Sequence, residues 1–183
     1  MGFKQYMDEL LEDYDREEHE DILETARAIS ADDKDVMKQM KLAVDQPRTY
    51  CKNNIERFDD RGIDLEGGEP ADDDLDADEL LFLSMVDELE AHGYAFELDW
   101  KCELADFLWG LEQMKNYHLI ADVIPTVAFD ANKDIEVWGK ELNAALGGKA
   151  RVCYIAIDSD SYPLTIITAE AFEAIPIPMV LSM

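Results

Sequence analysis

Basic residues and cysteines are scarce in this sequence, and it contains no long apolar run. Its 183 residues include 16 Lys and Arg against 43 Asp and Glu, which gives a formal net charge of −27. Proteins bind nucleic acids and anionic membrane surfaces mainly through Lys and Arg, so this charge argues against both kinds of partner. No apolar stretch approaches the length needed to span a bilayer. We therefore expect a protein that binds neither nucleic acid nor membrane.

The cysteines Cys51, Cys102 and Cys153 are odd in number and far apart. That pattern fits neither a disulfide framework nor a paired zinc site, so we expect three reduced thiols in the core. The N-terminal segment becomes acidic before any apolar run begins, which is unlike a secretory signal. Together these observations predict a cytoplasmic location.

The signatures of common catalytic sites are also missing from the sequence. It contains no nucleophile elbow, no phosphate-binding loop and no dinucleotide fingerprint. The three histidines are scattered, and none has the spacing to a Cys or another His that zinc ligands show. The sequence therefore predicts no catalytic residue, no metal site and no cofactor.

Acidic residues are what this sequence has in abundance. Between Gly62 and Trp100 it carries fourteen of them and no Lys or Arg. We predict an exposed acidic face at Asp72, Asp73 and Asp74. Three explanations of the acidity stay open: solubility, adaptation to high salt, and attraction of a basic partner. The hydrophobic content of 48% is high enough for the chain to fold.

Composition and periodicity divide the chain into three parts. Residues 1–60 carry apolar residues at helical spacing, with acids on the opposite face, and predict a helical subdomain. Residues 61–75 are rich in Gly, Pro and Asp and predict an acidic loop. Residues 76–183 mix helical and strand patterns. We place the domain boundary in the loop.

The third part predicts an α+β fold with a small, mainly antiparallel sheet. The expected strands are 93–98, 151–157 and 164–168, and the last two form a hairpin. The expected covering helices are 77–91, 100–115 and 131–146. Several polar residues fit helix N-caps: Asp32 or Asp33, Asp76, Asp99 and Thr168. Pro176 and Pro178 are expected to end regular structure.

The predicted helix after Asp99 presents a broad apolar face, so we expect Trp100 and Trp109 to be buried against the sheet. Within the preceding strand, Glu97 and Asp99 lie two residues apart and therefore share a face. Paired carboxylates of this kind can perform acid–base chemistry.

One segment comes close to a calcium-binding loop. Residues 130–141 have acidic residues at the expected spacing, but Ile135 occupies the sixth position, where such a loop needs Gly for its sharp turn. We predict that calcium does not bind tightly there. Asp130 as an N-cap and Asp134 as an acid of the first helical turn explain the same residues.

Two segments resemble a family of bacterial proteins known as a domain of unknown function. One is the strand-to-helix junction Leu98-Asp99-Trp100-Lys101, and the other is the turn Asp158-Ser159-Asp160-Ser161-Tyr162. The resemblance implies an intracellular α+β domain and no assigned activity. Each segment contains a strand that needs a neighbour, so we expect the two to lie side by side. The candidate binding residues are Asp99, Trp100, Lys101, Asp158, Asp160 and Tyr162.

Two functional hypotheses follow from these patterns. The first is a non-catalytic interaction protein, similar to an inhibitor or an immunity protein, whose acidic face binds a basic partner. The second is a hydrolase or a metal-binding domain that uses carboxylates at strand ends. A deep pocket with converging carboxylates of perturbed pKa favours the second hypothesis, and a flat or convex acidic surface favours the first.

Overall fold

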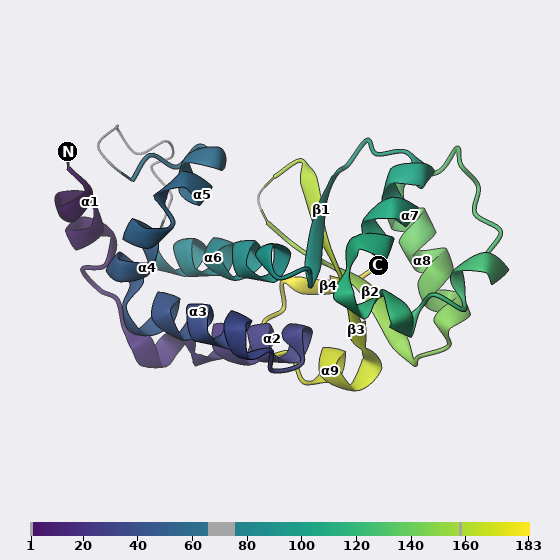
Figure 1. The fold of residues 1–183 in the computed structure, drawn as a ribbon, viewed down its shortest axis with the longest axis horizontal. Coiled ribbons are helices and arrows are strands. Elements are labelled where there is room, and N and C mark those ends of the chain that lie inside the picture. Colours follow the sequence, from purple (N-terminus) through teal and green to yellow (C-terminus); the bar gives the residue numbers. More distant parts are fainter. Residues whose placement is uncertain (1, 66–75, 158) are drawn as a thin grey trace.

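The computed structural model describes residues 2–65, 76–157 and 159–183, and they form the expected α+β fold (Figure 1). The first half is helical: α1 (Phe3–Leu10), η1 (Arg16–His19), α2 (Glu20–Ser30), α3 (Lys34–Asp45), α4 (Pro47–Asn53), α5 (Ile55–Asp60) and α6 (Ala77–Ala91). The second half contains β1 (Ala95–Asp99), α7 (Leu104–Gln113), η2 (Lys115–Leu119), η3 (Ile124–Thr126), α8 (Ile135–Leu146), β2 (Ala150–Ile155), β3 (Ser161–Thr168), α9 (Ala169–Glu173) and β4 (Val180–Ser182). Among all the residues that the structure describes, no helix has both the length and the apolar character to cross a membrane.

The strands form one antiparallel sheet in the order β1-β3-β2-β4. The three predicted strands and the β2–β3 hairpin are confirmed. The sequence prediction missed β4, because Pro176 and Pro178 were expected to end regular structure. This strand has only three residues and extends the sheet by pairing with β2, where Ser182 lies opposite Cys153. A strand so short depends on its neighbour, and its own residues carry little periodicity.

Three of the predicted N-caps are confirmed, and two, Asp99 and Asp130, are wrong. The side chains of Asp33, Asp76 and Thr168 accept hydrogen bonds from the first backbone amides of α3, α6 and α9. Asp99 instead accepts from the backbone N–H of Lys101 at 2.7 Å, in a turn before the helix. Helix α7 begins only at Leu104, because Glu103 and Asp106 form a capping box: the side chain of each pairs with the backbone N–H of the other.

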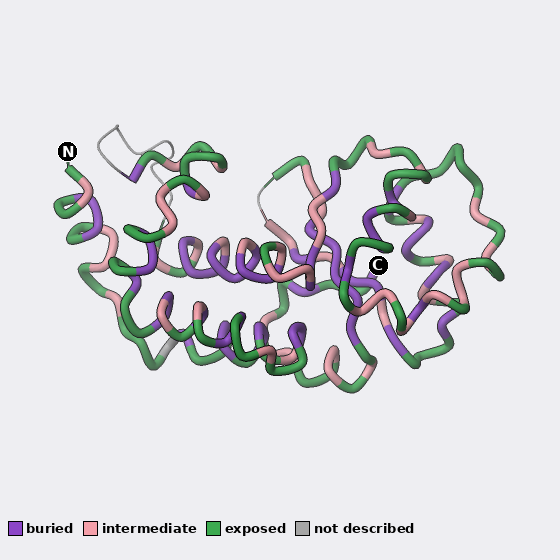
Figure 2. The backbone as a smooth tube through the Cα atoms, in the orientation of Figure 1, coloured by how far each residue is buried: buried purple, intermediate pink, exposed green. Residues whose placement is uncertain are grey.

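Two apolar cores lie on opposite sides of the sheet (Figure 2). The larger core joins α1 to α6 to one sheet face, through residues such as Cys153, Ile155 and Ile167. The smaller core packs α7 and α8 against the other face, through Leu98 and Leu164. The sheet therefore connects the helical first part with the rest of the chain. The division into 1–60, 61–75 and 76–183 stays a prediction.

The expectation that Trp100 and Trp109 are core residues is wrong. Their exposed fractions are 49% and 54%. Trp100 precedes α7 in the turn after β1, and Trp109 lies beside the buried stripe of α7, where it meets Phe96 edge to face at 5.2 Å. Gly110 faces the sheet instead: a Cβ there would lie 2.9 Å from the Phe96 ring. Of the cysteines, Cys51 and Cys153 are buried as expected, whereas Cys102 is half-buried.

Candidate functional site

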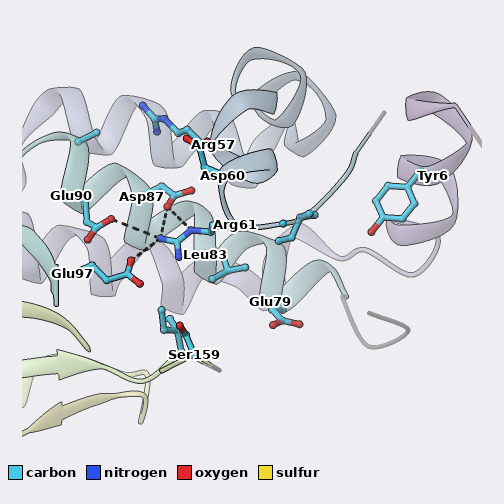
Figure 3. Close-up of a pocket in the computed structure, with 14 residues that line it drawn as sticks. Tyr6, Arg57, Asp60, Arg61, Glu79, Leu83, Asp87, Glu90, Glu97 and Ser159 are labelled. Atoms are coloured by element: carbon cyan, nitrogen blue, oxygen red, sulfur yellow. Dashed lines mark hydrogen bonds and ion pairs between the residues drawn. The ribbon is translucent and has the colours of Figure 1, made fainter. Parts of the chain in front are cut away.

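A cavity of about 690 Å³ opens between α5, α6 and β1 (Figure 3). Its described lining is strongly polar. It holds five acidic residues against two arginines, Asp60, Glu79, Asp87, Glu90 and Glu97 against Arg57 and Arg61. Charge of one sign gathered in a concave surface concentrates the electrostatic field, so this cavity attracts cations.

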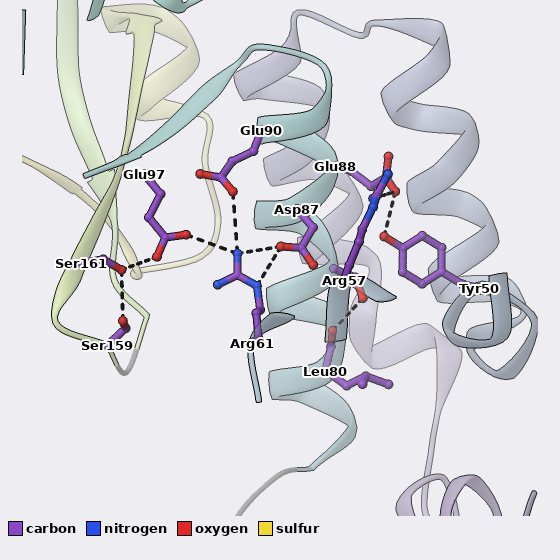
Figure 4. A network of polar contacts seen from close by, with 11 residues as sticks. Tyr50, Arg57, Arg61, Leu80, Asp87, Glu88, Glu90, Glu97, Ser159 and Ser161 are labelled. Carbon is purple, nitrogen blue, oxygen red and sulfur yellow. Dashed lines mark hydrogen bonds and ion pairs between the residues drawn. The ribbon is translucent and has the colours of Figure 1, made fainter. Parts of the chain in front are cut away.

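The acidic residues come from two elements with different periods. Glu79, Leu83, Asp87 and Glu90 follow one another at intervals of three and four residues and therefore line one side of α6. The side of α6 that carries Leu81, Met85 and Leu89 is buried in the larger core. Glu97 points into the cavity from β1 (Figure 4).

Arg61 contacts three of the carboxylates in the cavity, those of Asp87, Glu90 and Glu97, which we call the inner carboxylates. Its Nε and Nη2 lie 2.8 and 2.6 Å from Asp87 Oδ1, and Nη2 lies 3.4 Å from Glu97 Oε2 and 3.8 Å from Glu90 Oε2 (Figure 4). Arg61 directly follows α5, and the next residue, Gly62, has φ +80°, a left-handed conformation that suits glycine. The guanidinium is thereby held between α6 and β1.

The inner carboxylates are poorly solvated. The Asp87 side chain is 9% exposed, and its Oδ2 is buried with no hydrogen-bond partner among the described residues. Burial raises the pKa of Asp87, an effect that Arg61 opposes. Burial, and next the charge of Glu97, raise the pKa of Glu90 to about 7. One guanidinium thus faces three carboxylates, and one of these titrates near neutral pH.

Glu97 also fixes the edge of the sheet. The Ser161 hydroxyl donates to Glu97 Oε1, and Ser159 Oγ lies 3.0 Å from Ser161 Oγ. Glu97 lies on β1, an edge strand of the sheet. The carboxylates therefore hold the strand end, the serine turn and α6 in one polar network.

A second ion pair lies on the neighbouring side of α6. Glu88 is 1% exposed, and its Oε1 accepts from Arg57 Nη1 at 2.6 Å and from the Tyr50 hydroxyl at 2.8 Å. Burial, followed by the charge of Glu88, raises the pKa of Tyr50, so its phenol stays protonated and donates. This pair anchors α4 and α5 to α6 and keeps Arg57 in place.

The structure brings together the two segments that the sequence singled out. In the β1–β3 pair, Asp99 lies opposite Ser161 and Leu98 opposite Tyr162, and the Trp100 N–H donates to the Asp160 carbonyl at 3.1 Å. Lys101 Nζ lies 4.5 Å from the centroid of the Trp100 ring. The side-by-side arrangement is confirmed, and a separate hollow of about 460 Å³ is lined there by Trp100, Asp160 and Tyr162.

The binding role of these residues stays a prediction. The Asp99 carboxylate is engaged by the backbone of its own turn, and the Tyr162 hydroxyl donates to Glu136 at 3.1 Å. Asp158, and the acidic face at Asp72, Asp73 and Asp74, lie outside the described residues.

Sequence reasoning singled out Glu97 and missed Arg61, Asp87 and Glu90. A usable signal was present: Asp87 and Glu90 follow the mostly apolar stretch 80–86 of α6 at a spacing of three residues, which places both on one side. Arg61 carried no such signal, because its partners are far away in the sequence.

The segment that resembles a calcium loop forms ordinary helix-start contacts. Asp134 is the N-cap of α8, since its Oδ1 accepts from the Val137 N–H at 3.0 Å. Asp130, the N-cap expected from the sequence, instead accepts from the backbone and side-chain amides of Asn132, both at 3.0 Å. In residues 2–65, 76–157 and 159–183 there is no group of three or more His, Cys, Asp or Glu side chains arranged to hold a metal ion.

Comparison with known proteins places the chain in a family. No curated protein and no solved structure matches it. A family described as "Domain of unknown function (DUF6630)" matches residues 21–176. This range includes every charged residue that lines the cavity between α5, α6 and β1, which we call the carboxylate cavity, and both segments discussed above. The chain therefore belongs to this family of unknown function, which confirms the resemblance to an uncharacterised family.

Proposed function

We propose that this protein is a non-catalytic interaction protein, similar to an inhibitor or an immunity protein, that binds a basic protein through the carboxylate cavity. The observation that carries the proposal is the excess of acidic residues over arginines in the cavity lining. Arg61 can neutralise only one of the negative charges on Asp87, Glu90 and Glu97. The charges that remain can therefore attract a second cation.

The buried oxygen of Asp87 supports the same proposal. Asp87 Oδ2 has no donor within the described chain, and a buried acceptor without a donor costs about 1–3 kcal/mol. A guanidinium or ammonium group from a partner would supply that donor once the side chains around the oxygen move aside to admit it. Charge-assisted hydrogen bonds are also stronger in a poorly solvated cavity than in water.

The negative charge of the whole chain supports fast association with such a partner. Long-range attraction raises association rates, and salt screens it over about 8 Å at physiological ionic strength. We therefore propose that Asp72, Asp73 and Asp74 steer the partner, so that neutralising them slows association more than it speeds dissociation. We also propose a cytoplasmic location, which the three unpaired cysteines support.

The test is calorimetric titration with a tetra-arginine peptide at two ionic strengths. At pH 8, where Glu90 is ionised, Glu90→Gln combined with Glu97→Gln removes two charges from the cavity, and we expect it to weaken binding by about tenfold. Glu24→Gln combined with Glu112→Gln removes the same charge from exposed positions elsewhere and serves as the matched control. Equal weakening in both double variants would show that only the overall field acts, and would reject the cavity as the binding site.

One observation favours the hydrolase hypothesis as a second candidate. Glu90, with its pKa raised to about 7, lies close to Glu97, and a carboxyl group that titrates near neutral pH beside a second carboxylate is an arrangement that acid–base catalysis uses. Arg61 bridges both carboxylates, however, so neither is free to transfer protons. Hydrolysis of nitrophenyl esters or glycosides that disappears in both Glu90→Gln and Glu97→Gln would move this candidate to first place.

A further inference from the structure

A second hollow, of about 770 Å³, lies between α3, the α4–α5 junction and α6, and its charge is opposite to that of the carboxylate cavity. Its charged lining residues are Lys38, Lys41 and Arg57 against Asp45 and Glu88. This excess of positive charge is unexpected in a chain with a net charge of −27.

Both acidic residues of the hollow are already neutralised. Asp45 Oδ1 lies 2.9 Å from Arg16 Nε, and Glu88 is paired with Arg57. Lys38 and Lys41, by contrast, have no ion pair within the described residues. The two lysines therefore leave an uncompensated positive charge in the hollow.

The arrangement of these cations suits an anion. Lys38 and Lys41 are three residues apart on α3, so both project from the same side of that helix. Arg57 faces them from α5, held by the buried Glu88, while 37% of its side chain stays exposed. Its remaining N–H groups form a planar fork of the kind that binds phosphate or carboxylate oxygens.

Amide side chains complete the set of donors. Gln39, Gln46 and Asn53 line the hollow, and within the described part of the chain none of their side chains makes a hydrogen bond. The acids elsewhere on the surface do not cancel this local charge, because salt screens exposed charges beyond about 8 Å.

We propose that the hollow lined by Lys38, Lys41 and Arg57 is a binding site for a small anion that bears phosphate or carboxylate groups. The hollow shares Arg57 with the lining of the carboxylate cavity, but its lysines and amides lie on the other side of the Arg57–Glu88 pair, and the site does not depend on the function proposed above. Its size suits a small molecule, and the surrounding acidic surface disfavours a long polyanion such as nucleic acid.

Calorimetric titration of the full chain with pyrophosphate, in buffer freed of divalent metals, tests the proposal. We expect saturable binding of one pyrophosphate, weakened by about tenfold in Lys38→Gln combined with Lys41→Gln, because two charge-assisted contacts are lost. Lys133→Gln combined with Lys149→Gln removes the same charge from exposed positions elsewhere and should change the affinity by at most about twofold.

Two further measurements identify the preferred anion and locate its binding site. Titrations with inorganic phosphate and with citrate identify the preferred anion, and binding of either class that depends on Lys38 and Lys41 supports the site. Side-chain amide signals of Asn53 should shift on binding in NMR spectra. No saturable binding of any of the three anions at millimolar concentration, or equal weakening in both double variants, would overturn the proposal.

Discussion

Replacing Glu90 with Gln should change how the stability of this protein depends on pH. Burial and the charge of Glu97 raise the pKa of Glu90 from 4.5 to about 7 in the folded state. The folded state therefore holds a proton that the unfolded chain has already released. Unfolding free energy consequently falls as pH rises from about 4.5 to 7, because the folded state binds more protons in that window.

The magnitude follows from the shift and from the exposure of the side chain. The rise of the Glu90 pKa from 4.5 to about 7 corresponds to about 3 kcal/mol. The side chain is 26% exposed and lies 3.8 Å from Arg61 Nη2, so solvent screening and the lost ion pair reduce the gain. We expect Glu90→Gln to be about 1–2 kcal/mol more stable than the parent protein at pH 8, and nearly equal to it at pH 4.5.

Urea unfolding followed by circular dichroism at intervals between pH 4.5 and 8 measures this difference. Gln keeps the shape of Glu and one of its acceptor oxygens, so the comparison isolates the charge. Glu112→Gln, on the exposed side of α7, is the matched control and should follow the parent profile. Parallel profiles for Glu90→Gln and the parent protein would refute the reasoning, because Glu90 would then have the same pKa in both states.

Other substitutions test the contacts around the sheet and the cavity. Arg61→Ala leaves Asp87 buried without its cation and should cost about 3–5 kcal/mol in urea unfolding at pH 7, whereas a loss below about 1 kcal/mol would mean that solvent reaches the carboxylate. Gly110→Ala should lower the melting temperature, because the new Cβ lies 2.9 Å from the Phe96 ring. The overpacking cost of about 1–3 kcal/mol outweighs the gain in helix propensity of about 1 kcal/mol. An unchanged melting temperature would show that α7 can move away from β1. Trp109→Ala should cost only about 1–2 kcal/mol, since the ring is 54% exposed and its main contact is Phe96. A loss as large as that of a buried aromatic residue would contradict the exposed position.

Local patterns in the sequence were enough to predict most of the secondary structure. Helical periodicity predicted α6 with the bounds 77–91 that the structure has, and the Asp76 cap at its start. Alternating apolar residues predicted β1, and the apolar run after Gly148 predicted β2, with small errors at the ends. These features depend on residues a few positions apart, so the sequence displays them directly.

Tertiary packing decided the rest. Periodicity identifies the apolar side of a helix but not what covers each residue, so Trp109 was assigned to the core although the sheet meets α7 at Gly110. The acidity of the chain was evident from its composition, whereas the carboxylate cavity depends on Arg61, Asp87 and Glu97 meeting from three separate elements. The sequence by itself determined the elements, the acidity and the family resemblance. Only the folded chain determined which charges share a cavity, because charges far apart in sequence interact through the short distances and low solvation that packing creates.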